Sequence, residues 1–317
     1  MNNFKKIGLS ALAGSLVAFS ASAAEFTISG GASLTMSDQG EAQEGNRFTM
    51  GDSLTFSASG ETDGGLSITA SYELDGDIVD DYSMSFGNDT MGTISFGGSG
   101  NSSAMGAVDD VTPNAYEEAW HGPSGALVIN GFGGVNQFNY TSPTVGGITL
   151  SASYLPSSEA VSAKSTTAYA VSYSPEMVEG LTVGYATQDD NSGSASTTSD
   201  DTSESTMYAK YTYGSLTVGY QSSELDSDTN TEDADSTAFG ISYAVSDSLS
   251  IAYGQHTYET TGNTNAATGA DQESSAVSAS YTMGGMTIAG IMNDVDNVAG
   301  VAATDKEAYE LNLSFAF

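Results

Sequence analysis

The sequence predicts an all-β fold, a 16-stranded antiparallel transmembrane β-barrel, and three observations carry this prediction. After residue 23, no apolar stretch approaches the ~20 residues of a membrane-crossing helix. Segments with apolar side chains at every second position recur instead, as in half-buried strands. The composition, with Gly 37, Tyr 17, Pro 5 and abundant Ser and Thr, favours strands and turns over helices. Because lipid offers no partner to free backbone groups, strands cross a membrane only as a closed barrel.

The first 23 residues are typical of a signal peptide. Lys5 and Lys6 precede an apolar run at residues 7–19, and Ala21 and Ala23 provide small residues for cleavage. An inner-membrane anchor is the alternative, but this run is too short to cross a ~30 Å hydrocarbon core as a helix. We therefore expect export and cleavage after Ala23, with cleavage after Ala24 as the alternative, which leaves residues 24–317 as the barrel domain.

One strand pattern recurs after turn signals. It occupies residues 65–72 (GLSITASY), 147–154 (GITLSASY), 180–185 (GLTVGY), 215–220 (SLTVGY), 248–253 (SLSIAY) and 285–290 (GMTIAG). The last five copies begin 33, 35, 33 and 37 residues apart. Their alternation and their Gly and Thr content contradict a helical solenoid. The repeating unit is therefore a strand, a polar loop, a returning strand and a tight turn.

The repeat extends to sixteen expected strands. They span residues 25–37, 47–60, 65–74, 81–87, 92–98, 135–142, 147–155, 165–174, 180–188, 204–213, 215–223, 235–244, 248–258, 273–282, 285–293 and 306–317. An even number brings both termini to the turn side, where the first and last strands can pair. Returning strands end in Tyr140, Tyr173, Tyr213, Tyr243 and Tyr281, an expected girdle at the membrane interface. Side chains cannot fill a barrel of this size, so a water-filled channel is expected.

The charge excludes one class of function. The whole chain carries −34, and the leader holds two of the six basic residues and no acid, so residues 24–317 carry 4 − 40 = −36. Nucleic-acid binding is excluded, because it requires a basic surface. The absence of cysteine excludes a disulfide framework.

The chain lacks the residue patterns of an enzyme. A serine hydrolase needs a histidine to activate its nucleophile, and the sequence contains only His121 and His256. We expect His121 and its neighbour Trp120 to serve in loop packing or at a pore rim. Phosphate-binding loops and His/Cys metal spacings are absent from the sequence, so we expect no catalytic site, no metal site and no cofactor.

One acidic segment is similar to a calcium-binding loop. Asp226, Asp228 and Asn230 have the spacing of calcium ligands, but Thr231 occupies the position at which that loop needs glycine. Adventitious calcium binding by the acidic outer loops stays open.

The final strand is the most specific signal. Its residues of one face are apolar, namely Tyr309, Leu311, Leu313, Phe315 and Phe317, and the chain ends on an aromatic residue. With this strand, residues 54–74 (LTFSASGETDGGLSITASYEL) and 136–154 (NQFNYTSPTVGGITLSASY) resemble the Gram-negative general, trimeric outer-membrane porins, with an alphaproteobacterial character. The resemblance covers essentially the whole chain after the leader.

This resemblance implies a channel for passive diffusion of small hydrophilic solutes across the bacterial outer membrane. It also implies a homotrimer, contact with outer-membrane lipid and lipopolysaccharide, and recognition of the final strand by the barrel assembly machinery. In that family the third outer loop folds into the barrel, which here falls in residues 99–134 and carries Asp109, Asp110, Glu117 and Glu118. A solvated loop outside the pore is the alternative for these four acids.

The expected pore wall departs from the basic cluster of that family. Alternation directs only Arg47 and Lys210 inward among the basic residues. The inward positions of two early strands are small and neutral, namely Ser67, Thr69, Ser71, Ser83 and Ser85. We therefore expect a net negative lumen that prefers cations within a Debye length of ~8 Å.

A structural or adhesive outer-membrane barrel with an occluded lumen is the alternative function. Outward apolar runs such as Leu181, Val183 and Tyr185 look short against the ~25 Å apolar band of membrane barrels. Acidic outer loops would then serve contact rather than transport.

Overall fold

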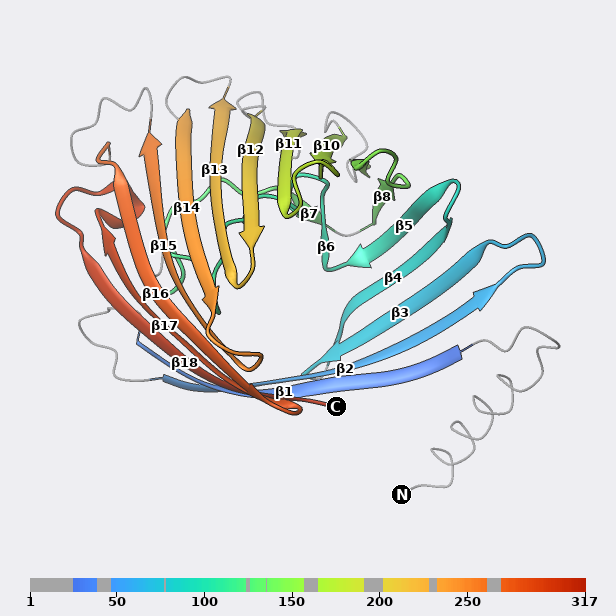
Figure 1. Cartoon of the computed structure of the whole chain (residues 1–317), viewed down its shortest axis with the longest axis horizontal. Coiled ribbons are helices and arrows are strands. Elements are labelled where there is room, and N and C mark those ends of the chain that lie inside the picture. Colours follow the sequence, from blue (N-terminus) through green and yellow to red (C-terminus); the bar gives the residue numbers. More distant parts are fainter. Residues whose placement is uncertain are drawn as a thin grey trace.

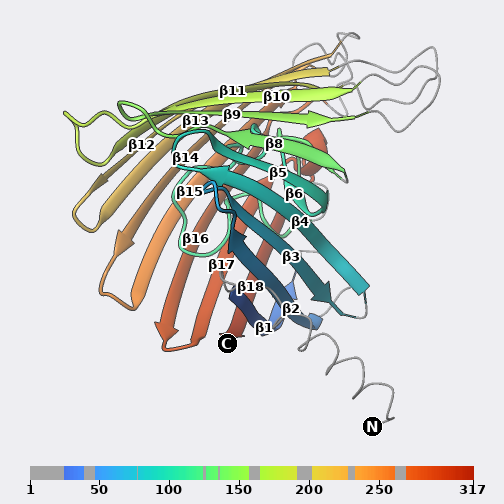
Figure 2. The ribbon, with the colours of Figure 1, turned by 90° about the vertical axis from the view of Figure 1, so that its right-hand side faces the viewer.

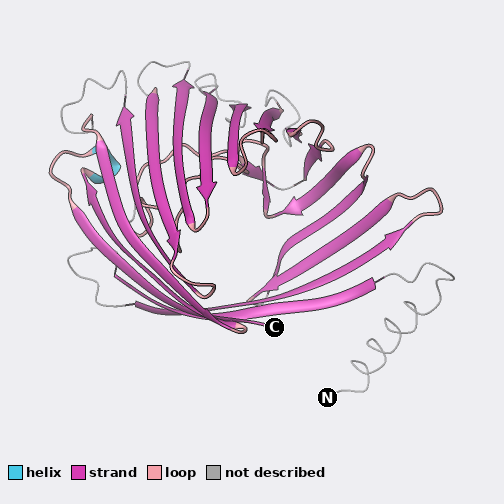
Figure 3. Ribbon diagram, in the orientation of Figure 1, coloured by secondary structure: helices cyan, strands magenta, loops and turns pink. Residues whose placement is uncertain are grey.

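The computed structural model describes residues 25–38, 47–76, 78–123, 126–134, 136–156, 165–190, 202–227, 233–260 and 269–317. The expected signal peptide and its cleavage site lie outside these residues. Strands dominate the described chain (Figure 3), with one short 3-10 turn, η1 (Val298–Gly300). No helix among the described residues is long and apolar enough to cross a membrane.

Sixteen of the described strands form a closed antiparallel barrel (Figures 1 and 2). Its first five strands are β1 (Glu25–Asp38), β2 (Arg47–Glu61), β3 (Ser67–Asp75), β4 (Ile78–Asn88) and β5 (Gly92–Ser99). The next five are β8 (Gln137–Thr141), β9 (Ile148–Leu155), β10 (Thr166–Tyr173), β11 (Leu181–Asp190) and β12 (Thr202–Tyr213). The last six are β13 (Leu216–Ser227), β14 (Ala234–Ala244), β15 (Leu249–Thr260), β16 (Gln272–Met283), β17 (Met286–Asp296) and β18 (Lys306–Ala316). The predicted fold class is confirmed.

The strand ends differ from the prediction in the polar loops. β13 continues to Ser227, opposite Thr202 of β12, although apolar alternation stops earlier. Backbone hydrogen bonds need no apolar side chain, so pairing continues beyond the signal that alternation provides. The small sheet of β6 (Asn101–Ser102) and β7 (Gly133–Gly134) was also not predicted, and it closes the base of the long segment between β5 and β8.

The barrel closes where its first and last strands meet. β1 pairs with β18 from Gly31 opposite Ala316 to Asp38 opposite Tyr309. Gly30 and Phe317 then exchange two backbone hydrogen bonds of 3.0 Å each. Closure satisfies the edges of both strands, as a barrel in lipid requires.

Alternate side chains divide each strand between two faces. On β16, Val277 and Tyr281 are exposed, whereas Ser274, Ala276 and Ser278, at the alternate positions, are buried. The exposed apolar set is the outer face, which meets lipid, and the five expected tyrosines of the girdle are all exposed. We call the opposite, inner set the polar face. It positions the site described next.

Candidate functional site

The segment between β6 and β7 lies against the polar face of the barrel. We call its described residues, 103–123 and 126–132, the loop segment; it passes alongside β12 to β16 in Figure 1. Its hydrogen bonds reach side chains of β9, β11, β13, β16, β17 and β18. The loop segment has no strand partner along most of its length, so the wall satisfies its backbone groups.

Gln221 of β13 makes several of these hydrogen bonds to the loop segment. Its Oε1 accepts from Val111 N at 3.0 Å, and its Nε2 donates to the carbonyls of Val108 at 3.1 Å and Asp109 at 2.7 Å. Thr206 of β12 accepts a further hydrogen bond from Nε2 at 2.9 Å. Both ends of this buried amide are thereby used, which fixes the loop segment at its first acidic residues.

Two further amides hold the loop segment in the same way. Gln272 of β16 accepts from Leu127 N at 2.8 Å and donates to Leu127 O at 3.1 Å. Gln188 of β11 accepts from Phe132 N at 3.0 Å and donates to Asn130 O at 3.4 Å. Both glutamine side chains are buried. They act as substitute strand partners for an irregular backbone.

Two glycines allow the loop segment to approach the wall between these amides. A Cβ at Gly219 of β13 would lie 2.5 Å from Pro113 Cδ, and a Cβ at Gly240 of β14 would lie 2.6 Å from Pro113 O. Larger residues at either position would displace Pro113. The wall is therefore shaped for this close contact as well as bonded to it.

The four predicted acids all lie on the loop segment. The Asp109 carboxylate accepts from Gly131 N at 2.6 Å. Burial raises the pKa of Asp109 to about 7, and repulsion from Asp110 adds to this rise, against the opposing effect of the Gly131 hydrogen bond. Burial likewise raises the pKa of Asp110, Glu117 and Glu118. The structure thus gathers these acids into one partly desolvated group.

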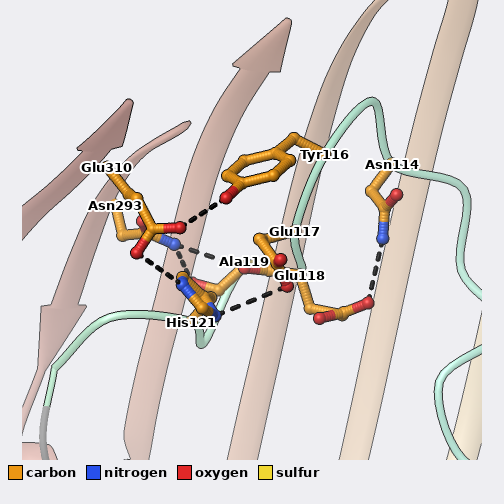
Figure 4. A network of polar contacts seen from close by, with 8 residues as sticks. All are labelled: Asn114, Tyr116, Glu117, Glu118, Ala119, His121, Asn293 and Glu310. Carbon is orange, nitrogen blue, oxygen red and sulfur yellow. Dashed lines mark hydrogen bonds and ion pairs between the residues drawn. The ribbon is translucent and has the colours of Figure 1, made fainter. Parts of the chain in front are cut away.

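A second set of contacts joins the loop segment to β18 (Figure 4). His121 Nδ1 lies 3.5 Å from Glu117 Oε2, and His121 Nε2 lies 3.4 Å from Glu310 Oε2. Tyr116 O–H donates to the other oxygen of Glu310. Burial, with the hydrogen bond to Glu310, raises the pKa of Tyr116, which keeps the phenol in its donor form. Glu310 is therefore a fifth acid at this site.

The aromatic residue beside His121, Trp120, contacts the second histidine of the sequence, His256. Trp120 packs on His256 with ring centroids 4.5 Å apart, and Ser236 lies 3.0 Å from His256 Nε2. His121 contacts Glu117 and Glu310 instead, so the two histidines have different partners. The packing of Trp120 agrees with its expected role in the loop, while the role of His121 stays a prediction.

All basic residues of the described chain lie on the polar face. Arg47 is in one cross-strand row with Ser37 and Glu310, and Lys210 is opposite Gly219. Lys306 is opposite Val295, which is buried on the same face. The prediction for Arg47 and Lys210 agrees with this placement, but the restriction to these two was wrong. The alternation of the last strand already directed Lys306 inward, together with Glu310.

The small residues predicted for the pore wall share the polar face of β3 and β4. Ser71 is opposite Ser83, and its Oγ lies 3.2 Å from Ser57 Oγ of β2. Thr69 is opposite Ser85, and Ser67 lies two residues before Thr69. Among the described residues, no hydrogen bond joins any of the five to the loop segment. The structure does not bring them into contact with the acids.

The residues of the final strand are placed as alternation predicts. Leu311, Leu313, Phe315 and Phe317 are exposed on the outer face, and Tyr309 occupies the same face. Their expected role as an assembly signal stays a prediction. Of the calcium-like segment, residues 228–232 lie outside the described residues.

Sequence reasoning missed the amides that hold the loop segment. They stand at inward positions of β11, β13, β16 and β17, and they are Gln188, Gln221, Gln272 and Asn293. A long amide at such a position was the available signal, since an inward side chain of this length must find polar partners.

A closed barrel with a lipid-facing apolar surface, a polar interior face and a long loop against that face defines the class of outer-membrane channel proteins. The model of the Gram-negative porin family matches residues 8–270, and the chain belongs to this family. It is therefore an outer-membrane channel protein for small solutes. The predicted family is confirmed, while its alphaproteobacterial character stays a prediction.

Solved structures share this fold. The chain is similar to the anion-selective porin from Comamonas acidovorans, with 14% identity, a TM-score of 0.67, and 93% of this chain and 100% of that chain covered. It is similar to OmpF from Salmonella typhi in complex with daunomycin, with 15% identity, a TM-score of 0.71, and coverage of 93% and 98%. A loop L8 deletion mutant of OmpT from Vibrio cholerae gives 16% identity, a TM-score of 0.65, and coverage of 93% and 99%. No curated protein sequence matches the chain.

Proposed function

We propose that the channel is water-filled, passes small hydrophilic solutes by diffusion and prefers cations. The observation that carries this proposal is the gathering of acids where the loop segment meets the polar face. These acids are Asp109, Asp110, Glu117, Glu118 and Glu310. The described chain offers three basic residues on the same face, namely Arg47, Lys210 and Lys306. An excess of negative charge in a narrow passage concentrates cations and repels anions.

The loop segment is the proposed constriction. Its bonds to β9, β11, β13, β16, β17 and β18 support a position against one side of the barrel, and the uncovered polar face of β3 and β4 supports an open passage on the other. Ions would then pass between the acids and a neutral wall of Ser67, Thr69, Ser71, Ser83 and Ser85. A neutral wall neither opposes nor strengthens the attraction of the acids for cations.

Fold alone does not set the sign of selectivity. A barrel with 14% identity to this chain is described as anion-selective, so the fold is compatible with a preference opposite to the proposed one. The side chains at the constriction decide the sign, because screening limits their influence to ~8 Å at physiological salt.

The test is the zero-current potential of single channels in a potassium chloride gradient. Potassium should carry most of the current. Replacing the four loop acids by amides, as Asp109→Asn, Asp110→Asn, Glu117→Gln and Glu118→Gln, should move this potential toward the nonselective value. A preference for chloride in the unmodified channel would overturn the proposal, and an absence of open steps would favour the adhesive barrel with an occluded lumen.

A matched variant separates the loop acids from total charge. Four exposed acids on the short turns, Asp89, Glu176, Glu179 and Asp247, can be changed to amides instead. This removes the same charge at the opposite end of the hairpins. The potential should stay close to that of the unmodified channel, because these turns lie outside the constriction.

Assembly is a further part of the proposal. Porin homologues are outer-membrane trimers that contact lipid and solutes. We expect a homotrimer, contact with lipopolysaccharide, recognition by the barrel assembly machinery and removal of residues 1–23. The mature protein should begin at Ala24 by N-terminal sequencing, and light scattering of the unboiled protein should give three times the mass of the chain. A monomer would contradict the assembly prediction and leave the channel proposal in place.

A further inference from the structure

Three ionisable side chains from two parts of the chain meet beside the proposed constriction. Glu117 and His121 come from one turn of the loop segment, and Glu310 comes from β18. One nitrogen or oxygen atom from each lies within 4.8 Å of the other two. The side chains of His121 and Glu117 are each 32% exposed and that of Glu310 is 17% exposed, so the cluster is partly shielded yet accessible to an ion.

A buried oxygen without a partner lies next to this cluster. Asn293 of β17 is 5% exposed, and its Nδ2 donates to the carbonyls of Glu118 at 3.3 Å and Ala119 at 2.9 Å. Its Oδ1 has no hydrogen-bond partner among the described residues. Burying an unpaired polar atom costs free energy, so this oxygen is a candidate ligand atom.

The register brings this oxygen to the cluster. Asn293 is opposite Ala308, two residues before Glu310 on β18, so Asn293 and Glu310 are diagonal neighbours on the polar face. Figure 4 shows the Asn293 amide beside the carboxylate of Glu310 and the ring of His121. A Cβ at Gly122, the residue after His121, would lie 3.9 Å from Asn293 Oδ1.

Neighbouring hydrogen bonds orient the cluster. Tyr116 O–H occupies one oxygen of Glu310, which leaves Oε2 directed to His121 Nε2. Glu117 approaches the other ring nitrogen, Nδ1. Histidines that bind metals commonly donate their second ring N–H to a carboxylate, which sets the tautomer and the ring orientation.

We infer that Glu117, His121 and Glu310 bind one divalent transition-metal ion of the zinc class and so connect the loop segment to β18. An imidazole ligand suits Zn²⁺, Cu²⁺ or Ni²⁺, whereas Mg²⁺ and Ca²⁺ prefer oxygen ligands alone. Tetrahedral Zn²⁺ holds its nitrogen and oxygen ligands about 3.3 Å apart. His121 Nε2 and Glu310 Oε2 already have this spacing at 3.4 Å.

The remaining ligands require only local movement. Glu117 turns its carboxylate from His121 Nδ1 toward the ion. Asn293 Oδ1, directly or through a water, completes the coordination. The backbone beside them is held by Ser278, which accepts from Ala115 N, and by Asn293, which donates to Ala119 O, so the ligands would reach the ion by rotation of their side chains.

Binding of this ion would change the channel in two ways. Its double positive charge would offset the acids and weaken cation preference. Its bonds would also couple the loop segment to the wall, and so reduce conductance. The inference goes beyond the proposed selectivity, since an ion can occupy this site whichever ion the channel prefers.

The test is a titration of the purified, folded protein in detergent with zinc chloride, in which isothermal calorimetry measures binding. We expect saturable binding, which weakens in acid because protons compete for the same ligands. His121→Gln and Glu310→Gln should each lower the affinity by about tenfold or more. Cobalt(II) provides an independent readout, because its tetrahedral absorption bands should disappear in His121→Gln.

Glu118→Gln is the matched control. It removes the same charge from the same turn but no proposed ligand, since Glu118 instead accepts a hydrogen bond from Asn114 at 3.0 Å. This variant should bind zinc nearly as tightly as the unmodified protein. Heat-modifiable electrophoretic mobility verifies that each variant is a folded barrel.

Two outcomes would overturn the inference. One is an absence of saturable zinc binding by the folded protein, and the other is equal affinity in His121→Gln, which would place the ion in the acidic outer loops. Neither outcome concerns the zero-current potential. A cation-selective channel without His121-dependent binding would therefore contradict this inference alone, and a chloride-selective channel with such binding would contradict the proposed function alone.

Discussion

The polar face differs between two parts of the barrel, although side chains alternate between the inner and outer faces in the same way in both. On β3 and β4 this face carries small hydroxyl side chains that remain half-buried or exposed, such as Ser71 and Ser83. On β11 to β17 the corresponding face carries buried amides such as Gln221 and Asn293, which bond to the backbone of the loop segment. One part is a free wall and the other is a binding surface for the chain's own loop.

This difference shows how a barrel can hold an irregular segment against its wall. A backbone without a strand partner must find donors and acceptors elsewhere. Amide side chains supply both at once, because each carries a donor and an acceptor at one end. Hydroxyls contribute only single bonds, as Ser153 does to Ala104 N and Ser278 to Ala115 N, and among the described residues no hydrogen bond joins the loop segment to β3 or β4.

The largest expected effect comes from altering the C-terminal end of β18, which pairs with β1 and closes the barrel. Phe315→Gln with Phe317→Gln, or removal of Phe317, should strongly reduce folded protein in the outer membrane, while export across the inner membrane continues. These changes remove exposed apolar side chains from the outer face at the end of β18, beside the backbone hydrogen bonds between Phe317 and Gly30. Outer-membrane yield and heat-modifiable mobility measure this effect.

Phe48→Gln with Met50→Gln is the control for the variant at the end of β18. Both residues are exposed on the outer face of β2, with Phe48 at 68%, so lipid-facing apolar area is lost away from the C-terminus. This control should fold in substantially higher yield. Equal yields of the two variants would show that the terminal residues have no special role in assembly.

The next effect concerns the amides that hold the loop segment. Gln221→Leu with Gln272→Leu removes the partners of Val111 N, Leu127 N and the carbonyls beside them. Each backbone group left unpaired costs about 1–3 kcal/mol, so the loop segment should detach from the wall for part of the time. Single-channel recordings should show larger or fluctuating conductance.

Substitutions on the free wall sharpen this comparison. Ser71→Ala with Ser83→Ala removes polar groups from the same face but leaves every bond to the loop segment intact. Conductance should stay uniform. Fluctuating conductance in this variant would mean that β3 and β4 also support the loop segment.

A smaller effect should follow from placing charge on the free wall. Ser71→Arg with Ser85→Arg adds two positive charges at diagonal positions that face the lumen. They should lower potassium preference, measured as a shift of the zero-current potential toward the nonselective value. Ser71→Gln with Ser85→Gln adds comparable bulk without charge and should change conductance more than selectivity. A shift shared by both variants would indicate a steric cause.

The smallest expected effect is the titration of one acid of the loop segment. The pKa of Asp109 is raised to about 7, mainly by burial. As the pH falls from about 8 to 6, Asp109 gains a proton, so cation preference should decline. Because its folded pKa lies above its ordinary value, its contribution to folding stability is fully present in acid and decreases as the pH rises through about 7.

Asp109→Asn tests this assignment. The amide oxygen can still accept from Gly131 N, but the charge is absent at every pH. The zero-current potential of this variant should vary less between these pH values than that of the unmodified channel. An unchanged pH dependence would assign the titration to Asp110, Glu117 or Glu118, whose pKa values are also raised.

The sequence by itself determined the barrel and the direction of its side chains. Alternation is a local property, so it correctly predicted sixteen strands, the inward positions of Arg47 and Lys210 and the apolar outer face of the last strand. It also located the acids on the long segment after β5. Strand ends in polar loops differed from the prediction, because backbone pairing there needs no apolar alternation.

Only the tertiary structure decided what the loop segment contacts. Gln221 bonds to Val108 across 113 residues of sequence, and His121 meets Glu310 across 189. No local pattern encodes such pairs, since closure of the barrel and the path of one irregular segment bring them together. For the same reason, the unpaired oxygen of Asn293 and the cluster beside it could be found only once β17, β18 and the loop segment were placed side by side.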